Sequence, residues 1–193
     1  MSIQFAVFAS GKGTNFQRLC EAEKAGELPG LQLAFLFCDK PCGAASIAED
    51  KGIPRLVLRP RDYADKAAFE TAVLKELKAR DIQLIALAGY MRLLGPTLLQ
   101  PFQRRVLNIH PSLLPLYPGK DAIARAFRDG VSQSGVSIHL VDEGLDSGPI
   151  LAQEVVKRTA EMDMAAFEAA IHKAEHQLYP RVLRDYAKGE FQL

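Results

Sequence analysis

The chain has 193 residues, a formal net charge of +1 and 48% hydrophobic residues. These values are typical of a folded globular protein and exclude a disordered chain. The near-neutral charge gives no electrostatic signal for nucleic acid. No apolar stretch reaches the roughly 20 residues that a membrane helix needs. We therefore expect a single domain over residues 1–193, with neither a nucleic-acid nor a membrane partner.

The three cysteines are Cys20, Cys38 and Cys42. The first residues lack a basic region, and their apolar run is too short for a signal peptide. An odd number of cysteines without such a signal predicts free thiols and a cytoplasmic location. Cys38 and Cys42 have the spacing of half a metal site, but no second pair follows. We expect no bound metal.

Strands and helices alternate along the first half of the chain. Short apolar runs predict buried strands, and amphipathic stretches closed by glycine predict helices. The predicted strands cover residues 3–9, 31–39, 53–58, 82–89 and 104–110. The predicted helices cover residues 15–26, 43–52 and 65–80, with a helical turn at 95–102. This order predicts an α/β fold: an open, mostly parallel twisted sheet with helices on both faces.

The second half of the chain has a different pattern. A short helix is predicted at residues 121–129 and a long one at 164–188. Between them, strands at 135–141 and 149–156 are separated by about seven residues, which predicts an antiparallel pair toward the C-terminal end. This change of pattern divides the domain into two halves, at about residues 1–100 and 101–193.

A glycine-rich loop, FASGKGTNF, lies between the first predicted strand and the first predicted helix. Gly11 and Gly13 let the backbone approach a ligand, and the helix N-terminus offers unpaired N–H groups to an anion. Thr14 and Asn15 can cap the helix or donate to that anion. The pattern is neither G-x-G-x-x-G nor the Walker motif. The loop is therefore either a phosphate site or a plain tight turn.

A second polar cluster ends the apolar run RVLNIHPSLLP. The period of two along a strand places Asn108 and His110 on the same face. Both lie at the C-terminal end of the predicted strand, the edge where open α/β sheets bind ligands. Either residue alone is more often structural, but together at this edge they favour a functional site.

A third cluster, VDEGLDSGPI, places three carboxylates in a loop with two glycines. A buried carboxylate beside an imidazole can orient it, as in catalytic triads. Ser112 lies near His110 but lacks the G-x-S-x-G turn, so an acyl-serine mechanism is not favoured. The remaining interpretation is acyl transfer between two bound substrates, with histidine as acid and base and asparagine as oxyanion donor.

Six segments, SGKGTN, AGYMRLL, LNIHPSLLP, YPGKDAI, GVSIHLVDEGLDSGPILAQ and AEHQLYP, span essentially the whole chain. Together they resemble the folate-dependent phosphoribosylglycinamide formyltransferases. The resemblance implies a Rossmann-like formyltransferase fold and the use of 10-formyltetrahydrofolate as co-substrate, with no metal. The implied reaction formylates the amine of glycinamide ribonucleotide in purine biosynthesis and releases tetrahydrofolate.

The resemblance also implies roles for individual residues. The implied catalytic residues are Asn108, His110 and Asp146. The implied phosphate and ribose contacts are Gly11, Gly13, Thr14 and Asn15, and Glu175 and His172. The implied folate contacts are Lys66, Tyr90, Met91, Arg92, Leu93, Leu94, Asn108, Val141, Asp142 and Asp146. We expect Asp146 to raise the pKa of His110, so that the protonated ring and the Asn108 amide donate to the oxyanion.

Three other positions carry separate expectations. GKDAI stands where one branch of the family has a histidine-containing segment, and Asp121 is expected to cap the following helix. Lys66 stands where an arginine is familiar, and lysine lacks the planar fork for a carboxylate. We expect His139, on a strand next to the site, to be structural.

Two other enzymes share the N-x-H and Asp pattern. Methionyl-tRNA formyltransferase carries a C-terminal tRNA-binding domain and a basic surface, whereas this nearly neutral chain ends at Leu193. Formyltetrahydrofolate deformylase carries an N-terminal regulatory domain, whereas the first strand here starts at residue 3. A binding module that holds a nucleotide phosphate without catalysis is the alternative of another class. The sequence leaves open whether the protein is a monomer or a homodimer.

Overall fold

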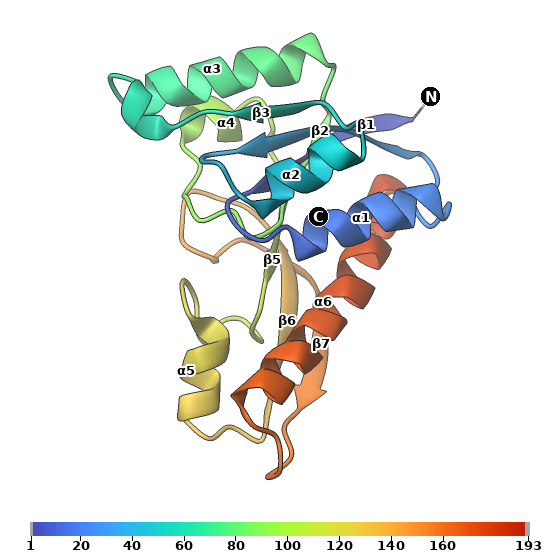
Figure 1. Ribbon diagram of the computed structural model, residues 1–193, viewed down its shortest axis with the longest axis vertical. Coiled ribbons are helices and arrows are strands. Elements are labelled where there is room, and N and C mark those ends of the chain that lie inside the picture. Colours follow the sequence, from blue (N-terminus) through green and yellow to red (C-terminus); the bar gives the residue numbers. More distant parts are fainter. Residues whose placement is uncertain (1, 192–193) are drawn as a thin grey trace.

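The computed structural model describes residues 2–191, which contain a seven-stranded sheet of order β3-β2-β1-β4-β5-β6-β7 (Figure 1). Its strands are β1 (Ile3–Ala9), β2 (Leu31–Cys38), β3 (Arg55–Val57), β4 (Leu84–Leu87), β5 (Val106–His110), β6 (Gln133–Leu140) and β7 (Ile150–Lys157). The helices are α1 (Thr14–Lys24), α2 (Gly43–Asp50), η1 (Pro60–Asp62), α3 (Lys66–Ala79), α4 (Pro96–Leu99), α5 (Ala122–Arg128) and α6 (Met164–Ala187).

The sheet is mostly parallel, which confirms the predicted fold class. β3, β2, β1, β4 and β5 are parallel neighbours, and the predicted antiparallel pair is β6 with β7. β6 is also antiparallel to β5. The chain turns back after β5 through α5 and does not cross the sheet, so β6 enters in the opposite direction.

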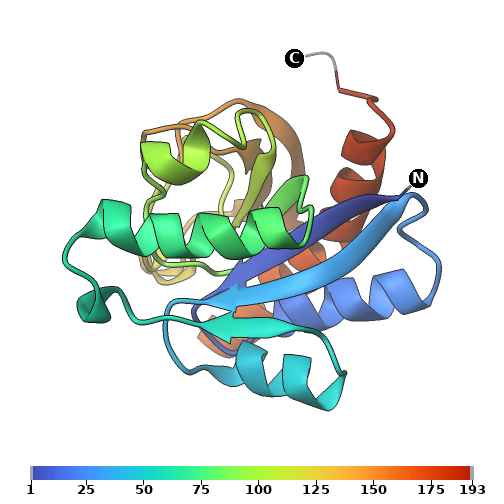
Figure 2. The ribbon, with the colours of Figure 1, turned by 90° about the horizontal axis from the view of Figure 1, so that it is seen from above.

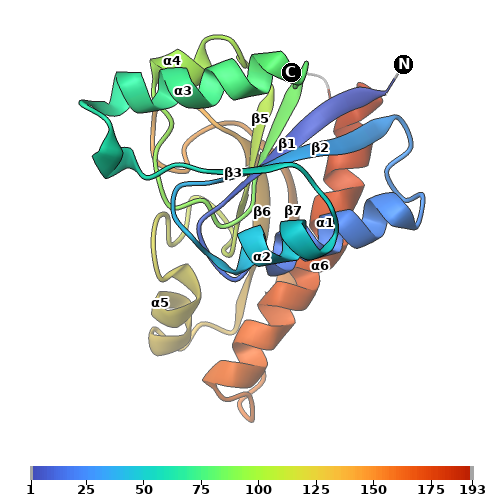
Figure 3. The ribbon, with the colours of Figure 1, turned by 45° about the horizontal axis from the view of Figure 1, so that its top comes forward.

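Helices cover both faces of the sheet, as Figures 2 and 3 show from two directions. α3 and α4 lie on one face, while α1, α2 and α6 lie on the other. Alternate residues of β1 divide between the two faces: Phe5 and Val7 pack in the core under α1 and α6, and Ala6 and Phe8 pack in the core under α3. Burial on both faces explains why the strands are continuous apolar runs.

The long helix α6 fixes two strand ends through Tyr179. This side chain is fully buried, and its hydroxyl lies 2.9 Å from the Leu87 carbonyl and 3.1 Å from the Leu107 carbonyl. Leu87 ends β4 and Leu107 lies in β5, so one phenol is held against both strands. A buried hydroxyl needs such partners, and this one holds the strands that carry the candidate site.

Two local features differ from the sequence prediction. The turn η1 was not predicted, because its three residues are too short to show a periodicity. Asp121 occupies the N-cap position of α5 but makes no side-chain capping bond, so the predicted cap is wrong. Its φ of 57° lies in the left-handed region, whereas a capping side chain needs an extended N-cap residue.

Candidate active site

The C-terminal ends of β1, β4 and β5 meet at one edge of the sheet, because these strands are parallel neighbours. The loops that follow β1 and β4 are joined by hydrogen bonds. The Ser10 N–H donates to the Gly89 carbonyl (3.2 Å), and the Met91 N–H donates to Ser10 Oγ (3.1 Å). The glycine-rich loop and the segment at residues 90–94 therefore lie next to each other, at the edge where such sheets bind ligands.

Asp146 stands at the centre of a polar cluster beside the end of β5. Its Oδ1 accepts a hydrogen bond from Asn108 Nδ2 (3.3 Å) and lies 3.5 Å from His139 Nε2. Its Oδ2 accepts from the Gly119 N–H (2.7 Å) and lies 3.3 Å from His110 Nδ1. The structure thus brings together the three residues predicted to be catalytic, and it adds His139 and the backbone of Gly119.

Strand register and loop geometry assemble this cluster. In the antiparallel pair of β5 with β6, Asn108 lies directly opposite His139. Asp146 has a φ of 52°, a left-handed conformation that aspartate and asparagine tolerate better than most residues. Its loop closes tightly at Gly148, where a Cβ atom would lie 1.9 Å from the Leu140 carbonyl oxygen. The loop therefore holds the carboxylate in one place.

His110 is buried, and both of its ring nitrogens face acceptors. Nε2 lies 2.8 Å from the Tyr117 carbonyl, so that nitrogen carries a proton, and Nδ1 faces Asp146. Burial lowers the pKa of His110 below its usual 6.5, although the Tyr117 carbonyl and Asp146 act in the opposite direction. Asp146 raises the pKa of His110, as expected, but desolvation of the imidazolium outweighs this attraction, so the net pKa is lowered and not raised.

Asp146 stays ionised despite its partial burial. Burial raises its pKa, but the contacts with His139 and the Gly119 N–H outweigh burial and hold the pKa below its usual range. His139 Nδ1 lies 2.8 Å from the Leu140 carbonyl, and its Nε2 faces both Asp146 and Asn108. Asn108 Nδ2 lies 3.1 Å from that Nε2. His139 thus fixes the Asn108 amide, a contact that the sequence prediction missed.

The glycine-rich loop leads into an uncapped helix. Gly13 is the N-cap residue of α1, and no side chain caps this helix. Instead of capping, Asn15 Nδ2 donates to Glu175 Oε2 (3.1 Å), and His172 Nδ1 lies 2.8 Å from the same oxygen. The residues predicted to contact phosphate and ribose therefore adjoin one another, with free N–H groups of the helix beside a buried carboxylate.

Gly11 and Gly13 differ in whether the surrounding structure leaves space for a side chain. Gly13 has a φ of 85°, and a Cβ atom there would lie 2.7 Å from the Ala44 Cα of α2. Gly11 has open space around the same position. Gly13 is therefore needed for the turn and for close packing of the backbones, while Gly11 has room for a Cβ atom.

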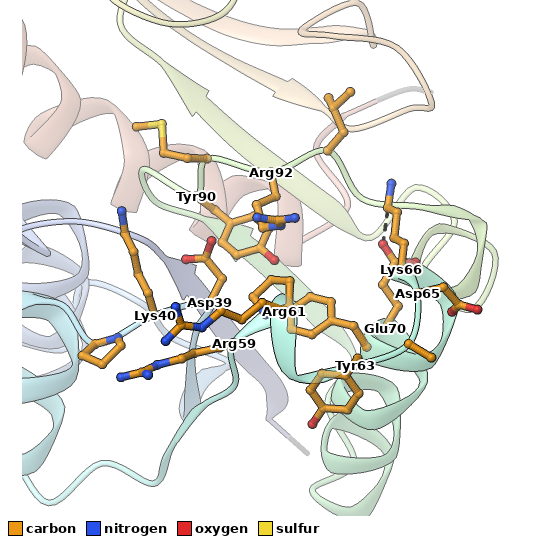
Figure 4. Close-up of a pocket in the computed structure, with 16 residues that line it drawn as sticks. Asp39, Lys40, Arg59, Arg61, Tyr63, Asp65, Lys66, Glu70, Tyr90 and Arg92 are labelled. Carbon is orange, nitrogen blue, oxygen red and sulfur yellow. Dashed lines mark ion pairs between the residues drawn. The ribbon is translucent and has the colours of Figure 1, made fainter.

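A cavity of about 1100 Å³ lies next to this edge, between the turn η1, helix α3 and the segment after β4 (Figure 4). Five of the residues predicted to bind folate line it: Lys66, Tyr90, Met91, Arg92 and Leu93. A sixth predicted residue, Leu94, is buried in the core under α3 instead. The catalytic cluster does not line this cavity.

The other predicted folate residues lie along the loop that carries Asp146. The Val141 N–H donates to the Val106 carbonyl (2.9 Å) and continues the contact between β6 and β5. Asp142 is exposed, and its Oδ1 accepts from the Gly144 N–H (3.0 Å) and Ser147 Oγ (2.8 Å) within the loop. Asp142 therefore shapes this loop, and the structure divides the predicted folate contacts between a cavity and a loop.

Residues 2–191 contain no group of three or more His, Cys, Asp or Glu side chains that could hold a metal ion. None of the helices in this range is both long enough and apolar enough to cross a membrane.

Residues 3–183 match the sequence profile of the formyl transferase family. The chain belongs to this family, and it is a formyltransferase. It is 46% identical over 182 residues to phosphoribosylglycinamide formyltransferase of Bacillus subtilis (strain 168), a match that covers 94% of this chain and 93% of that protein.

Solved structures give the same result. Glycinamide ribonucleotide transformylase 1 from Geobacillus kaustophilus is 51% identical with a TM-score of 0.93, and the match covers 97% of this chain and 100% of that one. Phosphoribosylglycinamide formyltransferase from Bacillus halodurans is 43% identical with a TM-score of 0.93, and 98% of each chain is covered. The predicted formyltransferase family and its fold are confirmed.

Proposed function

We propose that the protein transfers the formyl group of 10-formyltetrahydrofolate to the amine of glycinamide ribonucleotide in de novo purine biosynthesis. The observation that carries the proposal is the Asp146 cluster, at the same sheet edge as an uncapped helix N-terminus and the segment at residues 90–94. The names of the similar proteins support glycinamide ribonucleotide as the acceptor and formyl transfer as the reaction.

The reaction requires a neutral amine, and free amino groups titrate near pH 8, so a useful fraction is neutral at pH 7. The amine nitrogen forms a bond to the formyl carbon, and the carbonyl electrons move to oxygen. The tetrahedral intermediate collapses when the bond from carbon to N10 of the folate breaks. One proton must pass from the attacking amine to N10. The products are formylglycinamide ribonucleotide and tetrahydrofolate.

Asn108 and His110 are the donors that we assign to the oxyanion. The Asn108 amide is held by His139 and Asp146, and because each of its two hydrogens faces one of these partners, one of the two contacts must open when Asn108 donates to the oxyanion. His110 keeps Nε2 on the Tyr117 carbonyl and can donate from Nδ1 once that nitrogen is protonated. Negative charge on the intermediate favours this protonation, because it opposes the desolvation that keeps the ring neutral.

Asp146 is the group that we assign to proton transfer. Its low pKa makes it a weak base, but the ammonium formed by attack is a strong acid compared with the starting amine. A water molecule between Asp146 and that ammonium can relay the proton toward N10. The same negative charge stabilises the ammonium while it exists.

Ribonucleotide binding is assigned to the glycine-rich loop and α6. The free N–H groups at the start of α1, with Gly11 and Thr14, would hold the phosphate. Glu175 and His172 would hold the ribose hydroxyl groups, since a buried carboxylate accepts well from a diol. The segment at residues 90–94 and the loop at 141–146 would hold the folate between them.

The test is an assay of 10-formyltetrahydrofolate consumption with and without glycinamide ribonucleotide. We expect tetrahydrofolate to form only when the ribonucleotide is present, with one formylated product for each folate consumed. Release of formate without the ribonucleotide would instead favour formyltetrahydrofolate deformylase, in which water replaces the amine. Binding of the ribonucleotide without any turnover would favour the non-catalytic module.

The proposal includes three further expectations. The substrates are small molecules, with no nucleic-acid partner, and the free thiols Cys20, Cys38 and Cys42 suit a reducing cytoplasm. No metal takes part in any step of the mechanism. The protein is a monomer or a homodimer, which sedimentation of the purified protein would decide.

A further inference from the structure

The loop between β5 and α5, residues 111–121, supplies two backbone groups to the catalytic cluster. The Tyr117 carbonyl lies 2.8 Å from His110 Nε2, and the Gly119 N–H donates to Asp146 Oδ2 (2.7 Å). The described chain has no helix or strand within this loop. Regular backbone hydrogen bonding therefore does not fix these two groups, and their positions depend on the side chains that hold the loop.

A buried serine of β6, Ser137, holds the start of this loop. Ser137 is fully buried, and its Oγ donates to the Ser112 carbonyl (2.7 Å) and accepts from the Leu114 N–H (3.0 Å). Gln153 of β7 donates from Nε2 to the same Oγ (2.8 Å) and to the Leu114 carbonyl (3.0 Å). The hydroxyl hydrogen, both lone pairs of that oxygen and both amide hydrogens are therefore in use. We call Ser137 and Gln153, with these four hydrogen bonds, the loop clasp.

Strand register places the loop clasp beside the catalytic histidine. His110 lies directly opposite Ser137 in the pair of β5 with β6, and Ser137 lies directly opposite Gln153 in the pair of β6 with β7. Residues that lie opposite each other in a sheet share a face. The three side chains therefore form one row across three strands. His110 contacts the loop at Tyr117, and the loop clasp contacts its start.

The segment that joins the loop clasp to the catalytic cluster is short. Ser112 Oγ donates to the Leu116 carbonyl (2.5 Å), and Leu116 precedes Tyr117 in the chain. At the other end of the loop, Arg125 of α5 donates to the Pro118 carbonyl. Because α5 continues from the loop, this contact does not tie the loop to the sheet. The loop clasp does so, and a displacement at the start of the loop passes directly to Tyr117.

We propose that Ser137 and Gln153 are positioning residues, which act through the loop to keep its two backbone groups against the catalytic histidine and aspartate. The kinetic consequence of this inference rests on the proposed function, whereas the hold on the loop is testable without a substrate. A misplacement of about 1 Å in an active site can lower a rate about 10²-fold, so a loosened loop should slow the transfer step.

The first test is steady-state kinetics of two variants. Ser137→Ala removes the hydroxyl and leaves two loop backbone groups without their partner. We expect kcat to fall about 30-fold while KM for the ribonucleotide stays within about twofold, because the ribonucleotide is assigned to another loop. Gln153→Met keeps the length of the side chain but removes both donors. Gln153 is exposed, so kcat should fall less, by about fivefold.

Ser134→Ala is the matched control. Ser134 is also buried on β6, but it lies opposite Val156 and therefore faces the core under α6, on the other side of the sheet. Because this side chain lies on the face opposite the loop clasp, its removal should leave kcat nearly unchanged. An equal fall of kcat in Ser134→Ala would mean that any buried serine of β6 has the same effect, which overturns the proposal.

The second test is hydrogen exchange of the Gly119 N–H, measured by NMR on the ligand-free protein. In Ser137→Ala this exchange should become about tenfold faster, because the bond to Asp146 opens more often. The Val141 N–H, which donates to the Val106 carbonyl, should keep its rate if the sheet is intact. Faster exchange at both amides would show general loss of stability and overturn the proposal.

Unchanged kcat in Ser137→Ala also overturns the proposal, as does a fall in kcat without faster exchange at Gly119. Should Ser137→Ala not fold, Gln153→Met carries the same two measurements, because its side chain is exposed. Absence of formyl transfer in the natural chain refutes the proposed function. The exchange of the Gly119 N–H then still decides whether the loop clasp holds the loop.

Discussion

His110 with Asp146 and His172 with Glu175 are two histidine–carboxylate pairs in different surroundings. His110 is 6% exposed and lies 3.3 Å from its carboxylate, whereas His172 is 41% exposed and lies 2.8 Å from its carboxylate. Burial lowers the pKa of His110. The hydrogen bond that His172 donates to Glu175 raises the pKa of His172, against a smaller effect of burial. A neighbouring carboxylate therefore does not by itself decide the charge of a histidine.

The difference matches the tasks that we propose for the two regions. A neutral His110 can take up a proton when negative charge develops nearby, so its charge changes during the reaction. The raised pKa of His172 instead favours its charged form beside Glu175, which suits a site that binds the same neutral diol in every cycle. The four predictions below test this contrast, from the largest expected effect to the smallest.

Replacing Asp146 should have the largest effect. Asp146→Asn keeps the shape of the side chain and tolerates the left-handed backbone, but it removes the charge that faces His110 and the proton acceptor. We expect kcat to fall by about 10²–10⁴-fold while the affinity for the ribonucleotide is nearly unchanged. Asp50→Asn, at an exposed residue that ends α2, is the control. Steady-state kinetics measure both, and unchanged turnover would remove Asp146 from the mechanism.

The second prediction separates folding from binding in the glycine-rich loop, which touches the His172 region through Asn15. Gly13→Ala should reduce the free energy of unfolding by about 1–3 kcal/mol, because φ is positive and the new Cβ meets Ala44. Gly11→Ala has open space and should leave stability nearly unchanged while weakening ribonucleotide binding. Urea denaturation and a binding titration distinguish the two variants. Equal stability of both would contradict the packing role of Gly13.

The third prediction concerns Glu175. Glu175→Gln keeps the size of the side chain but loses the charge that accepts from Asn15 and pairs with His172. We expect the KM for the ribonucleotide to rise about tenfold, with a small change in kcat, because a charged hydrogen bond contributes about 1.5–3 kcal/mol. Glu168→Gln, on the same helix and 3.4 Å from His172, should change KM little. A fall in kcat alone would place Glu175 in the chemistry and not in binding.

The two histidine–carboxylate pairs also show how much of the fold and of the site could be predicted from the sequence. The period of two along β5 predicted that Asn108 and His110 share a face at the ligand edge, and the structure places both beside Asp146. Alternating strands and helices predicted the sheet, because burial on both faces leaves continuous apolar runs. Such features depend on local pattern, which a single sequence contains.

The features that were missed depend on contacts between distant residues. His139 joins the cluster because antiparallel register sets it opposite Asn108, and no local pattern fixes that register. The sign of the His110 pKa shift depends on how completely the chain encloses the ring, which spacing does not reveal. The phosphate contact of Gly13 stays a prediction, whereas its close packing against Ala44 could not be predicted, because it depends on where α2 packs.

The smallest expected effect is on stability at different pH values. The pKa of His172 is raised in the folded chain from its usual 6.5, so its stabilising contribution is fully present below about pH 6.5 and is lost as pH rises through the folded value. His172→Gln should therefore lower Tm more at about pH 6 than at about pH 9, although exposure of the ring keeps the difference small. Thermal melts of both chains measure this difference. An NMR titration of the natural chain should place the His172 midpoint above 6.5 and the His110 midpoint below it. The reverse order would mean that the carboxylate, and not burial, controls His110.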